Sequence, residues 1–468
     1  MAGEINMTTW VSADTIRAQF SQCMSEMYQT EVPLYGDLLQ LVNDINQQSL
    51  QQHPALKAQL EQTGELPRLS QERHGAIRLG KPEELANMRR VFAVMGMYPV
   101  GYYDLVPAGV PVHSTAFRAI DADALNRSPF RIFTSLLRLE LIDNVELRQL
   151  AEDVLAKRQI FTEQALALTA KFEQQGGLDA NDAEQFVQEV LETFRWHTAA
   201  PVSKDLYQAL HDQHRLIADV VAFKGPHINH LTPRTLDIDA VQTGMAERGI
   251  PPKAVVEGPP RRNCPILLRQ TSFKALQEQV TFTDHQGSHT ARFGEIEQRG
   301  VALTPKGRSL YDQLLAEARD CLGASPNEDN AERYMQILQD TFQAFPDTYL
   351  ELAQQDLAYF YYFAQGNTVE QGKRLWTQKD LLDLVTTGQV QIEPIVYEDF
   401  LPVSAAGIFQ SNLGEDGQGH YAAMSNQDIF EQCLGGEVCN EMQLYTETQQ
   451  QSIDTCLQQL NNHSFAGA

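Results

Sequence analysis

Two histidine-containing stretches and one acidic stretch carry side chains that could bind a metal ion. They are HGAIR at residues 74–78, HINH at residues 227–230 and GEIE at residues 294–297. Two histidines and one carboxylate, with open coordination positions, suit the O2 chemistry of non-heme Fe(II). The structural alternatives are hydrogen-bonded histidines in the core and an exposed Glu–Arg pair on a strand. The elements that carry these residues decide between the two interpretations.

The first histidine lies in a stretch that predicts a strand followed by a helix. Read as a strand, residues 72–80 place His74, Ala76 and Arg78 on one face, because side chains alternate along a strand. Pro82 suits the first position of the following helix. Arg78 could therefore bind a carboxylate near His74, and a structural ion pair is its alternative.

The second pair of histidines ends an apolar, β-branched run, residues 221–234, which predicts a strand. Alternation places His227 on one face and His230 on the other. The two histidine-containing stretches can be aligned by the predicted helix that follows each of them. This alignment pairs His74 with His227 better than with His230. We therefore expect His227 to be the ligand, although the pattern alone does not separate it from His230.

The acidic stretch lies in a predicted long strand, residues 290–303, in which Glu295 and Glu297 share one face. Periodicity leaves open which of the two carboxylates binds the metal. The histidines of the preceding turn, His285 and His289, are most simply solvated.

The order of the expected elements repeats along the chain. A strand, a helix and further strands recur after about 150 residues, which suggests a duplicated module. Residues 130–142 fit a strand or a helix. We expect an α+β fold of paired β-α-β-β-β modules with large helical insertions and a mixed C-terminal extension. The expected parts are an N-terminal helical segment (1–70), a first module (71–142), a helical insertion (143–218), a second module (219–304) and a mixed helical and strand region packed on the core (305–468).

Composition and charge restrict the partners. The 468 residues carry a net charge of −25, which repels nucleic acid and anionic membranes. The N-terminal residues lack the apolar region of a signal peptide, and no stretch approaches the roughly 18 apolar residues of a membrane span. The six cysteines form no CxxC pair. We therefore expect a cytoplasmic protein with reduced thiols that binds a small molecule, with neither nucleic acid nor membrane as a partner.

Four motifs together resemble the 2-oxoadipate dioxygenase/decarboxylase family, whose members are elaborated relatives of the vicinal oxygen chelate metalloenzymes. The motifs are HGAIR, GPHINHLTP, FGEIEQRGVALTPKGR and LPVSAAGIF. The resemblance runs over nearly the whole chain and implies a module pair that forms a cup around a metal. The site residues it implies are the Fe(II) ligands His74, His227 and Glu295 and the substrate-binding residues Arg78, Val403 and Ser404.

The resemblance also implies a reaction, the conversion of 2-oxoadipate and O2 to (R)-2-hydroxyglutarate and CO2 in lysine catabolism. A 2-oxo acid can chelate iron through its keto oxygen and carboxylate, which leaves one position for O2. The partners would then be a 2-oxo dicarboxylic acid and O2. Two alternatives remain open, a redox-inert metal-dependent lyase or isomerase of the same fold and a non-catalytic 2-oxo acid binding protein. O2 consumption and turnover distinguish them.

Overall fold

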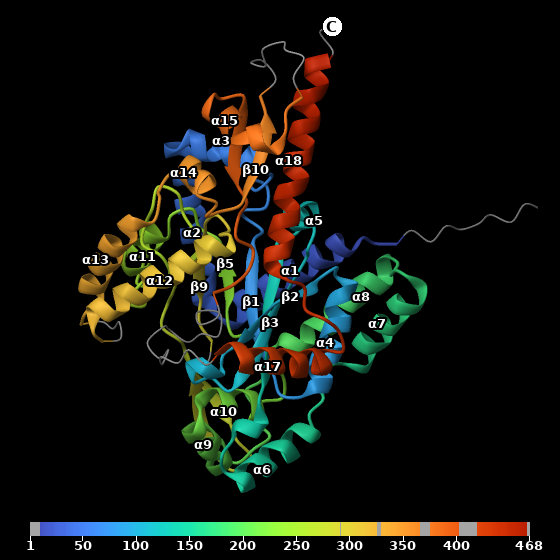
Figure 1. The fold of residues 1–468 in the computed structure, drawn as a ribbon. Helices are drawn as coiled ribbons and strands as arrows, with labels where there is room; N and C mark the ends of the chain where they lie inside the picture. The colour runs from blue at the N-terminus through green and yellow to red at the C-terminus, as the bar shows by residue number, and fades with distance from the viewer. Residues whose placement is uncertain (1–9, 291, 325–328, 366–374, 402–418, 466–468) are drawn as a thin grey trace, which may run out of the picture.

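The computed structural model describes residues 10–290, 292–324, 329–365, 375–401 and 419–465. The fold is α+β, as predicted, with a central sheet flanked by helices (Figure 1). The last helix, α18 (Glu441–Phe465), stands beside strand β10 (Phe360–Ala364) at one end of the molecule. None of the helices in this described part combines the length and the apolar character needed to cross a bilayer.

The main sheet has five strands within the described residues, in the order β2-β3-β4-β1-β5. Strand β1 pairs in parallel with β4 and antiparallel with β5, so it has a neighbour on each side. The bounds are β1 Arg73–Leu79, β2 Tyr98–Asp104, β3 Val112–Arg118, β4 Phe130–Leu137 and β5 Leu231–Pro233. Residues 130–142, which fitted either element, therefore form a strand and a short 3-10 turn.

The first predicted set of elements forms in the expected order, with helix α4 (Pro82–Val94) between β1 and β2. Pro82 occupies the start of the helix, where its missing N–H costs nothing. Leu85 and Met88 face the core at helical spacing. After the helix the chain reverses at Gly96, whose φ of +63° lies in the left-handed region that glycine tolerates.

The second set begins with β5 and helix α11 (Ile238–Glu247) and continues with two antiparallel strand pairs. One pair is β6 (Leu268–Ser272) with β9 (Glu295–Arg299); the other is β7 (Gln277–Thr281) with β8 (Gln286–Thr290). A bridge between Arg234 and Glu297 places β9 beside the end of β5. The acidic strand therefore lies next to the segment that carries the histidines.

Two predictions in this half are wrong. Helix α10 extends the predicted helical insertion to Val221. Residues 222–230 form bends and irregular backbone, so the strand predicted over residues 221–234 is only β5. The long strand predicted over residues 290–303 is divided between β8 and β9.

The other helices lie before, between and after these strands (Figure 1). Near the N-terminus they are α1 (Ala13–Glu31), α2 (Pro33–Gln52) and α3 (Pro54–Gln62). The middle of the chain has α5 (Ala122–Arg127), α6 (Val145–Ala156), α7 (Glu163–Gln175), α8 (Ala180–Leu191), α9 (Lys204–Gln213) and α10 (Arg215–Val221). The C-terminal third has α12 (Pro305–Leu322), α13 (Ala331–Thr341), α14 (Tyr349–Gln354), α15 (Leu381–Thr386), strand β11 (Val390–Pro394) and α17 (Gly419–Leu434) before α18.

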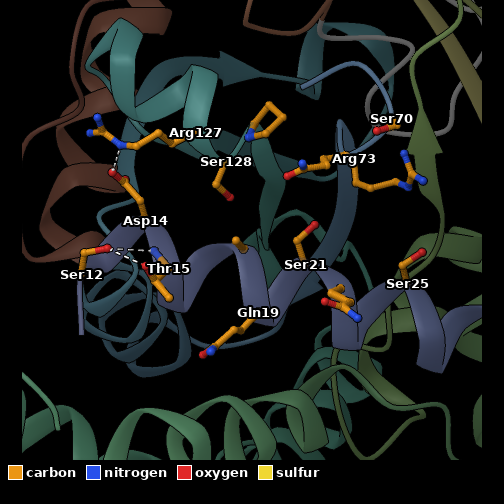
Figure 2. A pocket seen from close by; sticks show the side chains of 14 residues that line it. Ser12, Asp14, Thr15, Gln19, Ser21, Ser25, Ser70, Arg73, Arg127 and Ser128 are labelled. Atoms are coloured by element: carbon orange, nitrogen blue, oxygen red, sulfur yellow. Dashed lines mark hydrogen bonds and ion pairs between the residues drawn. The ribbon is translucent and has the colours of Figure 1, made fainter. Parts of the chain in front are cut away.

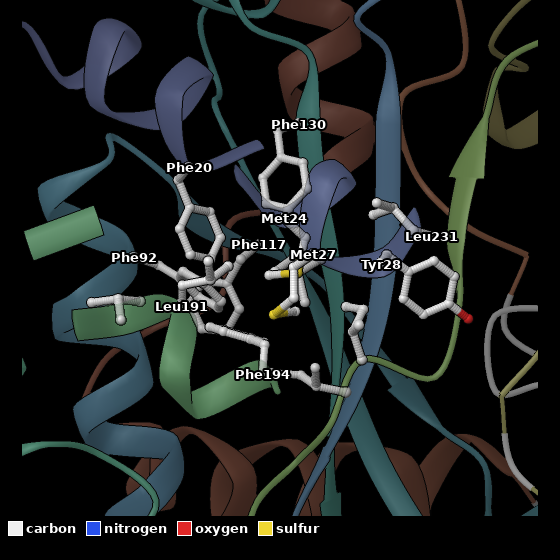
Figure 3. Packing of buried hydrophobic residues seen from close by; sticks show 14 of the residues in the cluster. Phe20, Met24, Met27, Tyr28, Phe92, Phe117, Phe130, Leu191, Phe194 and Leu231 are labelled. Carbon is white, nitrogen blue, oxygen red and sulfur yellow. The ribbon is translucent and has the colours of Figure 1, made fainter. Parts of the chain in front are cut away.

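Helix α1 packs its apolar face against the sheet (Figure 3). Phe20 is fully buried, and its ring lies edge-on to Phe130 of β4 and to Phe194, with centroids 5.6 and 5.5 Å away. Burying one such side chain contributes roughly 1.5–3 kcal/mol. Farther along the helix, the Tyr28 hydroxyl lies 3.1 Å from the Asn229 carbonyl and 2.8 Å from that of Phe293. Helix α1 thereby holds the segment around Asn229 against the residues that precede β9.

Candidate metal centre

His74, His230 and Glu295 bring their ligand atoms to one place. His74 lies on β1, His230 directly precedes β5, and Glu295 is the first residue of β9. Glu295 Oε1 lies 3.1 Å from His74 Nε2 and 3.8 Å from His230 Nε2. The ligand atoms of the three residues all lie within 4.8 Å of one another, and all three side chains are buried. Ligand bonds of roughly 2.0–2.2 Å could therefore meet at a single ion.

His230 is the residue whose surroundings best fit a metal. It is 1% exposed, and among the described residues neither of its ring nitrogens has a hydrogen-bond partner. A buried polar group without a partner costs roughly 1–3 kcal/mol, a cost that a bound ion would remove. Burial lowers the pKa of His230 to about 4, against the opposing effect of Glu295. The imidazole is therefore neutral near pH 7, the form that binds metals.

Glu295 is held in the ionised form that a metal ligand needs. Its Oε1 accepts hydrogen bonds from Gln270 Nε2 at 2.8 Å and from Thr232 Oγ1 at 3.2 Å. Burial would raise the pKa of Glu295, but His230 and His74 lower it below its usual range. Two strands, β5 and β6, thus orient this carboxylate from either side.

Glu297 lies on the opposite side of the His74 ring. Its Oε2 is 2.9 Å from His74 Nδ1, and Arg299 holds the same carboxylate through bonds of 2.8 and 3.0 Å. Burial would raise the pKa of Glu297, but Arg299 and His74 lower it to about 2. A carboxylate on the far nitrogen is the usual device that orients a metal-binding histidine. The structure thereby separates two glutamates that periodicity could not distinguish.

Arg299 belongs to a buried network of arginines and carboxylates that links distant parts of the chain. Glu72 and Glu398 form its acidic centre, and Arg131 Nη2 contacts both carboxylates. The other members are Arg68, which binds Glu72 and Glu398; Arg234, which binds Glu65 and Glu72; and Arg299, 3.6 Å from Glu72. This network restrains Arg299 and, through Glu297, the ring of His74.

The structure brings together two of the three predicted ligands. His74 and Glu295 meet, but His227 lies apart from them, with its Nε2 3.2 Å from Asp219 Oδ1. His230 occupies the position beside His74 that we expected His227 to take. His289, predicted to be solvated, is 5% exposed and lies in the same second cluster as His227. Val403 and Ser404 fall outside the described residues.

The sequence contained a signal for His230 that the first alignment missed. His74 lies eight residues before Pro82, the first residue of α4, and His230 lies eight residues before Ile238, the first residue of α11. His227 lies eleven residues before the same helix. The spacing H-x-x-x-R also occurs in both places, as HGAIR and HLTPR. Assigning the start of the second helix from its Asp237 cap would have favoured His230.

Arg78 lies at the edge of this centre, on the strand that carries His74. Its Nη1 donates to Asp219 Oδ2 at 2.7 Å and to Asn229 Oδ1 at 2.6 Å. Arg78 is also among the charges that lower the pKa of His230, after burial and His74. Arg78 thus takes part in an ion pair with Asp219, and its substrate role stays a prediction.

A pocket of about 630 Å³ lies elsewhere, between α1 and the start of β4 (Figure 2). Serine and glutamine side chains line much of it, and Arg127 pairs with Asp14 at 2.6 Å on its wall. None of the three residues of the candidate metal centre lines this pocket. It is therefore a separate polar surface feature.

The described residues form an α+β fold with a buried cluster of two histidines and one carboxylate, a set that could hold a metal ion. The family model for 2-oxoadipate dioxygenase/decarboxylase matches residues 20–412. The chain belongs to this family, as its motifs predicted.

Individual relatives cover almost the whole chain. The 2-oxoadipate dioxygenase/decarboxylase of Pseudomonas putida is 63% identical, over 97% of this chain and 98% of the relative. The Escherichia coli protein of the same name is 56% identical, over 96% and 99%. The crystal structure of the Pseudomonas putida hydroxyglutarate synthase in complex with 2-oxoadipate has a TM-score of 0.90 and 61% identity, over 97% of this chain and 99% of that one.

Proposed function

We propose that the protein is an Fe(II)-dependent dioxygenase/decarboxylase that converts 2-oxoadipate and O2 into (R)-2-hydroxyglutarate and CO2. The observation that carries the proposal is the convergence of His74, His230 and Glu295 on one buried point, where the nitrogens of His230 have no hydrogen-bond partner within the described ranges. Family membership and the 2-oxoadipate complex of the Pseudomonas putida relative support the choice of substrate. In this proposal His230 takes the place of His227 as the third ligand.

The three side chains would hold ferrous iron, which supplies redox chemistry with O2 and an electrophilic site for a 2-oxo acid. The atoms balance with no further reactant. The C1–C2 bond of 2-oxoadipate breaks, C1 leaves as CO2, and the keto carbon becomes a carboxylate. One atom of O2 enters that carboxylate and the other forms the hydroxyl on the adjacent carbon.

The protein's own residues orient the acid and keep water away. Arg78, on the same strand as His74, would pair with the distal carboxylate of the dicarboxylic acid. Phe400 lies edge-on to the His74 ring with centroids 4.8 Å apart, and Phe293 lies 5.0 Å from the His230 ring. Both phenyl groups are buried, so they exclude solvent from the two imidazoles.

The finer features of the fold and setting belong to the same proposal. We assign the two sets of strands to paired β-α-β-β-β modules that form a cup of the vicinal oxygen chelate type. The repeated order of elements and the equal spacing from His74 and His230 to their helices support this assignment. We place the reaction in lysine catabolism and in the cytoplasm.

Anaerobic loading with Fe(II), followed by an oxygen electrode and a panel of 2-oxo acids, tests the proposal. We expect 2-oxoadipate to cause O2 uptake and CO2 release in equal amounts, with label from 18O2 in the product hydroxyl. The matched control is protein loaded with Zn2+, which should bind the acid and consume no O2. Decarboxylation at full rate under argon would contradict the oxygenase and favour the lyase, and binding without turnover would favour the binding protein.

A further inference from the structure

A second buried cluster, formed by Asp219, His227 and His289, touches Arg78. Asp219 lies on α10, His289 on β8, and His227 in the segment between α10 and β5. Asp219 Oδ2 accepts the bond from Arg78 Nη1, and its Oδ1 lies 2.9 Å from His289 Nε2 and 3.2 Å from His227 Nε2. The proposed substrate arginine is therefore tied to an element remote from it in sequence.

The protons of this cluster can be assigned from its contacts. Burial would raise the pKa of Asp219, but His227 and Arg78 hold it well below its usual range, so the carboxylate only accepts. Because Asp219 only accepts, His289 donates to it from Nε2. The other ring nitrogen of His289, Nδ1, lies 2.8 Å from the Tyr207 hydroxyl. Tyr207, His289, Asp219 and Arg78 thus form one continuous chain of hydrogen bonds.

Aromatic packing fixes the chain in place. Trp196 stacks on His289 with an interplanar angle of 10°, and the His227 ring lies edge-on to the same indole at 4.6 Å. Phe223 contacts both imidazoles. The guanidinium of Arg292 lies 4.7 Å above Trp196. A carboxylate held this firmly leaves Arg78 little freedom at the atom it binds.

We propose that Asp219, supported by His289 and Tyr207, is a positioning residue that sets the orientation of Arg78 and thereby the preference for dicarboxylic over monocarboxylic 2-oxo acids. The inference rests on the proposed function, because it assigns Arg78 to the distal carboxylate. Asn229 holds the same Nη1 at 2.6 Å, next to the ligand His230, so the guanidinium is aligned between the two clusters. Losing the partner that orients a metal ligand typically costs about 10- to 100-fold in activity, and we expect a loss of the same order for the partner of Arg78.

The same three residues could instead hold a metal, since their ligand atoms lie within 4.8 Å of one another. The contacts favour positioning. Asp219 already binds the Arg78 cation through one oxygen and His289 through the other. An ion there would sit beside a guanidinium and displace the proton through which His289 donates. Metal content is therefore one readout of the test.

Asp219→Asn keeps the volume of the side chain and removes its charge, and Tyr207→Phe removes only the distal hydroxyl. We expect Asp219→Asn to lower kcat/KM on 2-oxoadipate by about 10- to 100-fold through KM, while KM for 2-oxohexanoate, the six-carbon monocarboxylic acid, stays unchanged. Tyr207→Phe should also lower the ratio of kcat/KM on 2-oxoadipate to kcat/KM on 2-oxohexanoate, by a smaller factor. Both variants should keep the wild-type iron content.

Asp239→Asn is the control, because it breaks another Arg–Asp pair, with Arg269 at 2.7 and 2.9 Å, on helix α11. Its substrate ratio should match the wild type. Wild-type protein without any preference for 2-oxoadipate refutes the proposed function and this inference together. If the wild type prefers 2-oxoadipate and both Asp219→Asn and Tyr207→Phe keep that preference, only the inference is refuted. Equal losses of activity on both acids would refute it as well. A second equivalent of bound metal that Asp219→Asn abolishes would also overturn it and assign a metal site.

Discussion

His74 uses both nitrogens of its ring, and this determines the roles of the acidic residues around it. Nε2 faces Glu295 at 3.1 Å, and Nδ1 faces Glu297 at 2.9 Å. Burial would lower the pKa of His74, but the two carboxylates raise it, Glu297 foremost. A proton kept on Nδ1 by Glu297 leaves the lone pair of Nε2 directed at the cluster. Of two glutamates on one strand face, only Glu295 is placed to be a ligand.

The two histidines of HINH should behave oppositely when replaced. His230→Ala removes a proposed ligand and should abolish iron binding, measured by metal analysis after anaerobic loading. His227→Ala, the matched control three residues away, removes a ring that contacts Asp219 and should keep the iron. Iron retained by His230→Ala and lost by His227→Ala would restore the ligand set that the sequence first indicated.

Arg78→Leu should lose most activity on 2-oxoadipate while it still binds Fe(II). Removing one partner of a desolvated charge pair costs roughly 2–5 kcal/mol, which is about 30- to several-thousand-fold in kcat/KM. The loss should be much smaller on 2-oxohexanoate, which has no distal charge. Steady-state kinetics on the two acids measure the difference. Equal losses would mean that Arg78 holds the iron-side carboxylate or the fold.

At the scale of the elements, periodicity predicted β1, α4, β2 and β3 because each has a clear pattern and a clear end. The strand predicted over residues 221–234 is wrong at residues 222–230, because an apolar run can also be buried as irregular backbone. The proposed ligand His230 lies in that segment, where no alternation applies. The second cluster was missed because Asp219 and His289 lie 70 residues apart and meet only through packing.

Strand β9 is followed by Gly300, where the backbone of Pro265 leaves no room for a side chain. A Cβ on Gly300 would lie 2.2 Å from the carbonyl carbon and oxygen of Pro265, and backbone cannot move aside cheaply. We expect Gly300→Ala to lower the free energy of unfolding by about 1–3 kcal/mol or more, measured by denaturant unfolding. Displacement of β9 should also weaken iron binding through Glu295.

Gly36→Ala is the comparison for that variant. Gly36 lies inside helix α2, where an added Cβ meets only Gln29 Oε1, at 3.9 Å. Alanine should therefore stabilise the protein by about 0.5–1 kcal/mol. If Gly300→Ala were as stable as Gly36→Ala, the close approach of β9 to Pro265 would be wrong.

At the scale of the whole molecule, the buried arginine and carboxylate network joins distant parts of the chain. Arg68 binds Glu398, 330 residues later, at 2.9 and 3.0 Å. Burial would raise the pKa of Glu398, but Arg68 and Arg131 lower it to about 2. No pattern in the sequence predicts such a network, because the segment that carries Glu65, Arg68 and Glu72 meets Arg131, Arg234, Arg299 and Glu398 only in the fold.

This network should make the fold sensitive to acid. A carboxylate whose pKa is lower in the folded than in the unfolded protein contributes stability above its unfolded pKa, roughly 4.3. The contribution of Glu398 is lost as pH falls toward its folded pKa of about 2. The free energy of unfolding should therefore decrease between about pH 5 and pH 2, as urea titrations at several pH values would measure.

Glu398→Gln should lower stability at pH 7 and flatten that decrease, because one carboxylate with a depressed pKa is gone. Glu61→Gln serves as the control, since Glu61 is exposed and its pair with Lys57 spans 3.8 Å. Its stability should follow the wild type at every pH. An unchanged acid slope in Glu398→Gln would show that the network does not govern the acid transition.

Because His74 and Arg78 lie on one strand, the distance between them along β1 would set the length of the dicarboxylic acid that fits. Their Cα atoms are about 13 Å apart on an extended strand, and neighbouring positions on that face are about 6.7 Å apart. Moving the arginine to the neighbouring position on this face would change the length of acid that fits by several carbon–carbon bonds. A point mutation on β1 therefore cannot retune the proposed enzyme by a single methylene. Finer adjustment of length falls to the reach of the Arg78 side chain, which Asp219 and Asn229 hold.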